Sequence, residues 1–462
     1  MLFFRPLNPS SKICLAFTSV AVFSATGISE QLFSSKVLAS ENEKFRAGEF
    51  IIKVSSSSAL EKFAREHDLL FIPEPFLHTG SGDWYKLIDP ESRKTFSELK
   101  VAAAVHDDIV ALEPNHLWHA IEASRSENPN SDNVGPEPEP APRLPKSPRK
   151  DPRLDEAWGI AQVAAPEAWK KTIGSNQVVV ADIDTGIDYN HEDLVNNIWH
   201  NPREIPNDGI DNDGNGFIDD VVGWDFAKKD NRPWDDNGHG THTSGSIGAT
   251  GGNGKGVSGV AQRVSLMPVK FLDRTGSGST DEAILSINYA VASGAQILSN
   301  SWGGDEESKA LEDAIIEAGK KDVLFVAAAG NDGTNNDEIP MYPASYKLSN
   351  VIAVAASDRQ DQLADFSNFG VQSVHLAAPG DGILSTLSQN RYGILSGTSM
   401  ACPHVAGAAA LLKSFKPTLK AVEIKDLLVR SVDIIPSYNG KIISGGRLNV
   451  ARALAIASGN SQ

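Results

Sequence analysis

The stretch VVVADIDTG, residues 178–186, determines the fold class that we expect for this chain. Its apolar run shows no polar alternation, which is typical of a parallel strand covered on both faces. Further short apolar runs alternate with helical patterns, at residues 266–271, 297–300, 323–328 and 351–356. This alternation predicts an α/β fold with a doubly wound, mostly parallel sheet. Sites in such sheets lie beyond the carboxyl ends of strands, where we expect Asp184, Ser301 and Asn331.

The composition and the N-terminal residues limit the classes of function that are possible for this protein. The chain has 462 residues and a formal net charge of −17, which argues against nucleic acid binding because that requires clustered Lys and Arg. Residues 1–39 have the basic start and interrupted apolar run of an export signal, so we expect a secreted protein, extracellular or periplasmic. A membrane anchor or a disordered tail is the alternative for this segment. No later segment has the ~18 consecutive apolar residues of a membrane span.

Three regions follow the signal. Residues 44–123 alternate strand-like and helical patterns in an order that fits a small ferredoxin-like α+β domain. Residues 124–150 are rich in Pro, Glu and Ser, as expected of an extended linker. Residues 151–458 carry the predicted parallel sheet. Of the two cysteines, Cys14 leaves with the signal, so no internal disulfide is expected for Cys402.

An acid and a histidine are the first two reactive side chains that we expect. Asp184 ends its strand, and its carboxylate could accept the Nδ1 proton of a histidine or merely cap a turn. An aspartic-protease site is disfavoured because no second Asp-Thr/Ser-Gly follows. His239 lies in NGHGTHTSG, residues 237–245, and histidine has the near-neutral pKa that a general base needs. A metal pair with His242 is the alternative, but no third ligand is suitably spaced, so His242 is expected to be structural.

A serine and an asparagine complete the set. Ser399 lies in SGTSMACPHVAG, residues 396–407, which runs into an apolar helix. Free N–H groups and the dipole at a helix start suit a tetrahedral oxyanion, although a plain N-cap serine is the simpler interpretation. An α/β-hydrolase site is disfavoured because its acid and histidine would follow the serine. Asn331 ends FVAAAGN, residues 325–331, and is either an amide donor for the oxyanion or a turn residue.

Taken together, these residues resemble the subtilisin-like serine protease family (subtilases), and the resemblance covers the chain after the signal. It implies that Ser399 attacks the scissile carbonyl, His239 transfers the proton, Asp184 orients the imidazole and Asn331 binds the oxyanion. The implied partners are protein or peptide substrates, and we expect a monomer. Two alternatives are a catalytically silent calcium-binding protein of the same fold and an esterase or acyl transferase.

The resemblance also suggests an inhibitor and a substrate cleft. Residues 44–123 resemble an inhibitory pro-domain, cut by the enzyme itself between about residues 119 and 151 and then blocking the cleft. Extended substrate would add as a strand. The segment 301–303 resembles one wall of the pocket and 328–330 the other, so the expected substrate-binding residues are Ser301, Trp302, Gly303, Ala328 and Gly330. Trp302 could equally be a core aromatic.

An acidic loop predicts structural calcium. Oxygen-bearing side chains alternate along the loop with Gly216 at the sixth place, a spacing that wraps around a hard cation. The expected ligands are Asp211, Asp213, Asn215 and Asp219, and Asp208, or Asp219 and Asp220, could complete the shell. Val222 stands at the twelfth place, so the loop is not an EF-hand, and a solvated acidic turn is the alternative. The family resemblance suggests a second site with Asp193, the loop around Asn253, and Asp151.

Asp182 departs from the family pattern, which usually has an apolar residue there. Residues two apart on a strand face the same way, so Asp182 and Asp184 are expected to crowd one side of the sheet. One of the two carboxyl groups then has a raised pKa.

Overall fold

A computed structural model describes residues 44–121, 135–145 and 147–459. The expected export signal and much of the expected linker lie outside these residues. Across the described helices, none combines the length and apolar character needed to cross a membrane.

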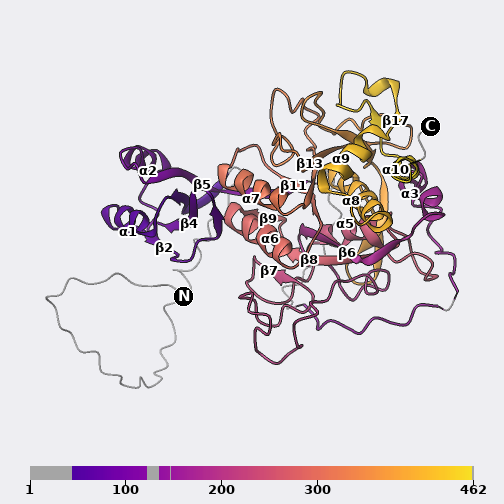
Figure 1. Cartoon of the computed structure of the whole chain (residues 1–462), viewed down its shortest axis with the longest axis horizontal. Coiled ribbons are helices and arrows are strands. Elements are labelled where there is room, and N and C mark those ends of the chain that lie inside the picture. Colours follow the sequence, from indigo (N-terminus) through magenta and orange to yellow (C-terminus); the bar gives the residue numbers. More distant parts are fainter. Residues whose placement is uncertain (1–43, 122–134, 146, 460–462) are drawn as a thin grey trace, which may run out of the picture.

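The large domain is built on a nine-stranded sheet, and this confirms the predicted mostly parallel α/β fold (Figure 1). From one edge to the other the strands are β17 (Asp433–Ile434), β18 (Gly446–Arg447), β14 (Leu376–Pro379), β13 (Val351–Ser357), β12 (Leu324–Ala328), β10 (Ile297–Asn300), β6 (Gly174–Asp184), β8 (Arg263–Lys270) and β7 (Trp224–Asp225). The β17–β18 pair is antiparallel and the other pairs are parallel. Most strands are buried along their whole length, because helices cover both faces.

The helices divide between the two faces of the sheet. One apolar cluster combines sheet residues with α5 (His239–Gly248), α8 (Thr398–Phe415), α9 (Ala421–Arg430), α10 (Val450–Ala457), α3 (Trp158–Gln162) and α4 (Ala165–Trp169). A second cluster, on the other face, includes α6 (Thr280–Ala292) and α7 (Lys309–Lys320). Neighbouring residues of β6 alternate between the clusters: Val180 belongs to the first, whereas Ala181 and Ile183 belong to the second.

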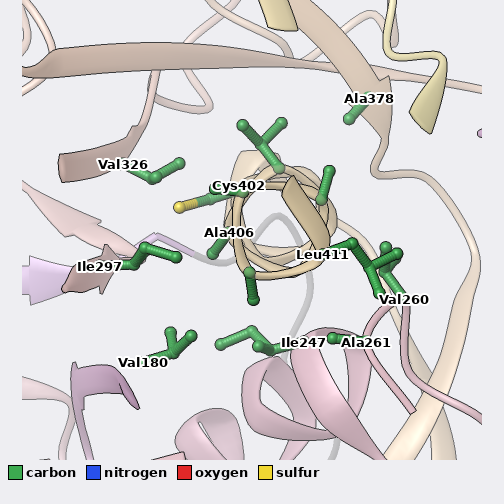
Figure 2. Close-up of a cluster of buried hydrophobic side chains, with 14 of the residues drawn as sticks. Val180, Ile247, Val260, Ala261, Ile297, Val326, Ala378, Cys402, Ala406 and Leu411 are labelled. Atoms are coloured by element: carbon green, nitrogen blue, oxygen red, sulfur yellow. The ribbon is translucent and has the colours of Figure 1, made fainter. Parts of the chain in front are cut away.

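Helix α8 lies at the centre of the first cluster (Figure 2). Its small residues Cys402 and Ala406 face the sheet residues Ile297, Val326 and Val180. Small side chains let the helix approach closely. A Cβ on Gly407 would lie 2.8 Å from the Ile247 carbonyl oxygen of α5, so the two helices are in close contact there.

The small domain contains a second sheet, which packs against the large domain. Its elements are β1 (Phe45–Val54), α1 (Ser57–Glu66), β2 (Leu70–Phe71), β3 (Leu77–Thr79), β4 (Gly82–Ile88), α2 (Phe96–Ala103) and β5 (Ile109–Ala120). The main strand order is β5-β1-β4-β2, with antiparallel pairing throughout. Phe50 and Ile52 of β1 pack with α1 and α2, whereas Ile51 joins the cluster of α6 and α7. Each face of this sheet is therefore covered by a different pair of helices.

Strand β5 extends from the small domain into the large one (Figure 1). There it pairs with two short strands, β9 (Ser277–Ser279) and β11 (Trp302–Gly303). A separate hairpin, β15 (Ile383–Leu387) and β16 (Arg391–Leu395), precedes α8, and a short 3₁₀ helix covers Pro436–Tyr438. The last residues of β5 lie at the carboxyl edge of the parallel sheet, beside the ends of β10 and β12.

Candidate active site

Asp184 and His239 form a buried hydrogen-bonded pair. Asp184 is the last residue of β6 and His239 the first of α5, and their Oδ1 and Nδ1 atoms are 2.7 Å apart. Both side chains are fully buried. The N–H of Thr185 also donates to Asp184 Oδ1 at 2.6 Å, which fixes the carboxylate. The pair holds one imidazole tautomer, with the proton on Nδ1, and leaves Nε2 as the basic nitrogen.

The start of α5 is fixed by its own contacts. Gly238 has φ 103°, a conformation that favours glycine and turns the chain sharply into the helix. Asp235 accepts hydrogen bonds from the N–H groups of Gly238 at 2.7 Å and of Thr241 at 2.8 Å. A carboxylate at a helix N-terminus satisfies donors that have no partner within the helix. These contacts hold His239 in position.

Ser399 lies at the same end of the molecule as His239. Ile247 comes eight positions after His239 and Gly407 eight positions after Ser399, and the two helices contact each other at Ile247 and Gly407. Nearer the two starts, His242 of α5 and His404 of α8 lie within electrostatic range of each other, so His239 and Ser399 lie on the same side of the helix contact. The Ser399 hydroxyl donates to the Ser301 carbonyl oxygen at 2.9 Å.

The Asn331 amide is oriented toward the same place. Its Oδ1 accepts hydrogen bonds from both the N–H and the hydroxyl of Thr398, each at 2.9 Å. The amide NH₂ must then point the other way, and it donates to the carbonyl oxygen of Ile121 at 3.2 Å. Thr398 is thus a positioning residue that the sequence analysis did not single out.

The end of the small domain pairs with the large domain as an extended strand. Leu117 to Ala120 form the middle strand between β9 and β11, with Trp302 opposite Ala120 and Ser279 opposite Leu117. Ile121 continues this strand, and its N–H donates to the Ser301 carbonyl oxygen at 3.1 Å. The chain therefore holds its own segment where the sequence analysis expected a substrate strand. The signal that we overlooked is the continuation LWHAI, residues 117–121, beyond the last expected strand residue.

Two side chains of this segment pack against the large domain. Trp118 is fully buried against Trp302, with ring centroids 5.8 Å apart, and its Nε1 donates to the Thr280 hydroxyl at 3.0 Å. Phe271 packs on the far side of Trp302 at 4.9 Å. Trp302 is therefore both buried and in direct contact with the bound strand. The side chain of Ile121 lies against Gly303, where an added Cβ would be 3.0 Å from Ile121 Cδ1.

The other expected pocket residues have different surroundings. Ser301 provides its carbonyl oxygen to both Ser399 and Ile121. Gly330 donates its N–H to the Thr398 hydroxyl at 3.1 Å, next to Asn331. Ala328 is part of the apolar cluster around α8.

Polar contacts fasten the small domain to α6 and α7. Asp281 at the start of α6 accepts from buried Lys86 at 2.9 Å and from the Asn115 amide at 2.7 Å. Glu113 accepts from the Ser308 hydroxyl at 2.6 Å and from the Lys309 N–H at 2.9 Å, at the start of α7. The small domain thus satisfies N-terminal donors of α7 and neutralises a buried Asp of α6.

The acidic loop brings together a slightly different set of carboxylates from the one expected. Oxygens of Glu204, Asp213 and Asp220 lie within 4.8 Å of one another. Glu204 Oε2 is buried and has no hydrogen-bond partner within the described residues. Of the expected ligands, Asp213 and Asp220 are in this cluster. Asp211 accepts the N–H groups of Gly214, Asn215 and Gly216, and Asp219 those of Asp208 and Gly209, so both also organise the loop backbone.

The second expected metal residues also lie side by side. Asn253 Nδ2 donates to Asp193 Oδ1 at 2.7 Å. Asp151 accepts the N–H groups of Gly252 and Gly254, on either side of Asn253.

His242, which we expected to be structural, is buried. Its Nε2 lies 3.0 Å from the carbonyl oxygen of Ile383, and burial lowers the pKa of His242 to about 3.

Comparison with known proteins of similar sequence identifies the class of protein to which this chain belongs. A sequence model of the Subtilase family matches residues 175–452. The Thermophilic serine proteinase of Bacillus sp. (strain AK1) is 40% identical over 287 residues, 62% of this chain and 64% of that protein. Thermitase of Thermoactinomyces vulgaris is 38% identical over 297 residues, 64% of this chain and 95% of that protein. The Major intracellular serine protease of Bacillus subtilis (strain 168) is 42% identical over 261 residues, 56% of this chain and 75% of that protein.

The matched region includes Asp184, His239, Asn331 and Ser399, and these comparisons define a serine endopeptidase. Within that class, the chain belongs to the Subtilase family. It spans just under two thirds of the length of the Bacillus AK1 relative and nearly all of thermitase.

Proposed function

We propose that the protein is a secreted serine endopeptidase that acts through Asp184, His239 and Ser399 and is made as a self-processed precursor. The observation that supports this most directly is the hydrogen bond from the Asn331 amide to the Ile121 carbonyl oxygen, because it marks the carbonyl that Ser399 would attack. Secretion rests on the character of residues 1–39.

The chemistry follows from the positions of the donors. The Ser399 oxygen attacks the Ile121 carbonyl carbon while His239 Nε2 takes the hydroxyl proton, so the hydroxyl must leave its hydrogen bond with Ser301. The imidazolium that forms is stabilised by Asp184 through Nδ1. The charge on the carbonyl oxygen is held by the Asn331 amide and by the Ser399 N–H at the start of α8. His239 then gives its proton to the leaving amine, and water repeats the cycle on the acyl-enzyme.

The processed bond in this proposal is the one that follows Ile121. After cleavage, residues 44–121 keep their β5 strand pairing and their contacts with α6 and α7, so the ferredoxin-like small domain becomes a product-like inhibitor. The β5-β1-β4-β2 strand order supports the ferredoxin-like assignment. Protein and peptide substrates would take the place of residues 117–121 in extended form.

We also propose structural calcium in the acidic loop. Glu204, Asp213 and Asp220 offer the hard carboxylate oxygens that Ca²⁺ prefers, and the unpartnered Glu204 oxygen fits such an ion. Asp193, Asn253 and Asp151 are the second candidate group. An ion bound here would stabilise the fold by joining these segments and would take no part in the proposed reaction.

The silent and esterase alternatives receive no support from a specific contact, and one experiment separates all three. Purified precursor and its Ser399→Ala variant are incubated and their masses compared over time. The protease proposal predicts that the first shortens to products cut after Ile121 while the second stays whole. A precursor that stays whole in both cases would contradict self-processing.

A further inference from the structure

A second buried carboxyl group lies beneath the Asp184–His239 pair. Asp182 occupies β6 two positions before Asp184, is fully buried, and stands between Pro268 of β8 and Ser299 of β10. Because residues two apart on a strand share a face, its side chain points toward α5 and α8, as that of Asp184 does. The roles proposed for Asp184, His239 and Ser399 leave it without a function.

Two hydroxyl groups of α5 meet one oxygen of Asp182. Thr243 Oγ1 lies 2.7 Å and Ser244 Oγ 2.6 Å from Asp182 Oδ2. These contacts join the helix that begins at His239 to the strand that ends at Asp184. Asp182 therefore connects the two elements that carry the histidine and its carboxylate.

The number of protons in this cluster favours a neutral carboxylic acid. Thr243 Oγ1 is also 3.0 Å from the Gly240 carbonyl oxygen, and a hydroxyl has one proton to donate. If Asp182 were ionised, Thr243 could serve only one of its two acceptors. If Asp182 Oδ2 carries a proton, it donates to Thr243, Thr243 donates to Gly240, and Ser244 donates to Asp182, so every contact is a hydrogen bond.

The surroundings of Asp182 also favour its neutral, protonated form. Asp182 Oδ1 is buried without a hydrogen-bond partner among the described residues, and no described Lys or Arg pairs with Asp182. The titratable groups that face it are Asp184 on β6, His239 on α5 and Cys402 on α8. Burial, and then the charge of Asp184, raise the pKa of Asp182 well above its usual range.

We propose that Asp182 is a positioning residue that keeps its proton at neutral pH and, as a neutral acid, ties α5 to β6 behind the Asp184–His239 pair. This inference rests on the proposed function, because Asp182 acts through those two residues. Asp184 is then the single carboxylate charge that faces His239. Ionisation of Asp182 in alkali would break the donation to Thr243 and add a second charge below the pair.

The first test needs no catalytic activity. Infrared difference spectra at neutral pH compare the full-length Ser399→Ala precursor with the same precursor carrying Asp182→Asn. The expected result is a carbonyl band of a protonated carboxylic acid in the first protein that is missing from the second. A difference spectrum that contains ionised carboxylate bands instead would overturn the proposal, even if the wild-type chain cleaved nothing.

The second test follows the pH dependence of kcat/KM in processed enzyme. Asp182→Asn keeps a neutral side chain whose NH₂, in the place of Oδ2, can donate to the hydroxyls of both Thr243 and Ser244, so it should lower kcat only a few-fold and move the acid limb by less than about 0.3 units. Asp182→Val loses both contacts and should lower kcat about tenfold or more with a smaller change in KM. An acid limb that moves down by about one unit or more in Asp182→Asn would mean that a charge had been removed, and would overturn the proposal.

Discussion

The Asn331 amide donates to the carbonyl oxygen of Ile121 at 3.2 Å, so a residue of the small domain stands at the proposed reaction centre of the large one. The Ile121 N–H is held by Ser301, whose carbonyl oxygen also accepts the Ser399 hydroxyl. Ile121 is thus held by Ser301 through its N–H and by Asn331 through its carbonyl oxygen. This arrangement leads to predictions about processing, turnover, inhibition and stability.

Processing should depend on the side chain at residue 121. Ile121 is buried against Gly303, so Ile121→Asp would place a charge in an apolar pocket and should slow self-cleavage by at least about tenfold. Mass spectrometry of the products over time gives the rate, and the wild-type product should begin at residue 122. Val105→Asp, at a position of the small domain that is 80% exposed, is the matched control and should process normally. Equal rates for both variants would contradict the assignment of the bond.

Asn331→Ala should lower turnover with little effect on substrate binding. Thr398 aims the amide, and its loss removes one donor to the developing oxyanion while leaving the strand contacts in place. Loss of one such donor costs about 10²–10³ in kcat, a magnitude that was measured in an enzyme of this family. Steady-state kinetics with a peptide substrate tests this, and a large rise in KM with unchanged kcat would argue against an oxyanion role.

Trp118 should hold the cleaved small domain in the cleft. It is fully buried against Trp302, and truncation of such an aromatic anchor typically costs 2 kcal/mol or more of binding, about thirtyfold in affinity. Trp118→Ala precursor should therefore become active sooner after cleavage than wild type. Cleavage and substrate hydrolysis are followed in the same sample, with Val105→Ala as the control. An unchanged delay between the two events would show that the anchor lies elsewhere.

Much of the large domain could be predicted from the sequence, because its strands are apolar on both faces and its reactive residues follow them. The run 178–186 contains both the strand and Asp184 at its end. Trp302 could not be assigned from the sequence, since a tryptophan in the core and one that lines a pocket look alike. In the structure it is both, because its partner Trp118 comes from the other domain.

The acidic loop marks where sequence spacing reached its limit. Alternating oxygens predicted Asp211 and Asp219 as ligands, and in the structure both carboxylates also accept backbone N–H groups that shape the loop. Glu204 lies before the motif and joins Asp213 and Asp220 only through the fold. A rule based on spacing within the loop cannot include Glu204, because only the fold brings this residue next to the loop.

Calcium removal should destabilise the protein through this cluster. If the free Ca²⁺ concentration is 100 times the Kd of this site, a chelator removes about 2.7 kcal/mol of stability and lowers the Tm. Glu204→Gln should lower the Tm in calcium and make the further fall in Tm on adding the chelator smaller than in the wild-type protein. Asp426→Asn, which removes a carboxylate outside the cluster with a side chain that is 64% exposed, should keep the full chelator effect. A Tm of the wild-type protein that does not respond to the chelator would contradict a structural ion.

Stability should fall with rising pH because of Asp182. Its pKa is raised from 3.8 to about 8 in the folded protein, first by burial and then by Asp184, so the folded state keeps a proton that the unfolded chain releases. The contribution is therefore fully present below about pH 4 and is lost as pH rises toward 8, with a slope of at most about 1.4 kcal/mol per pH unit. Asp182→Asn has no proton to release. Denaturant unfolding of the Ser399→Ala precursor, with and without Asp182→Asn, at about pH 5 and pH 8 tests this. The free energy difference between the two proteins should shift in favour of the Asn variant as the pH rises, whereas a difference that is independent of pH would mean that Asp182 is ionised throughout the range.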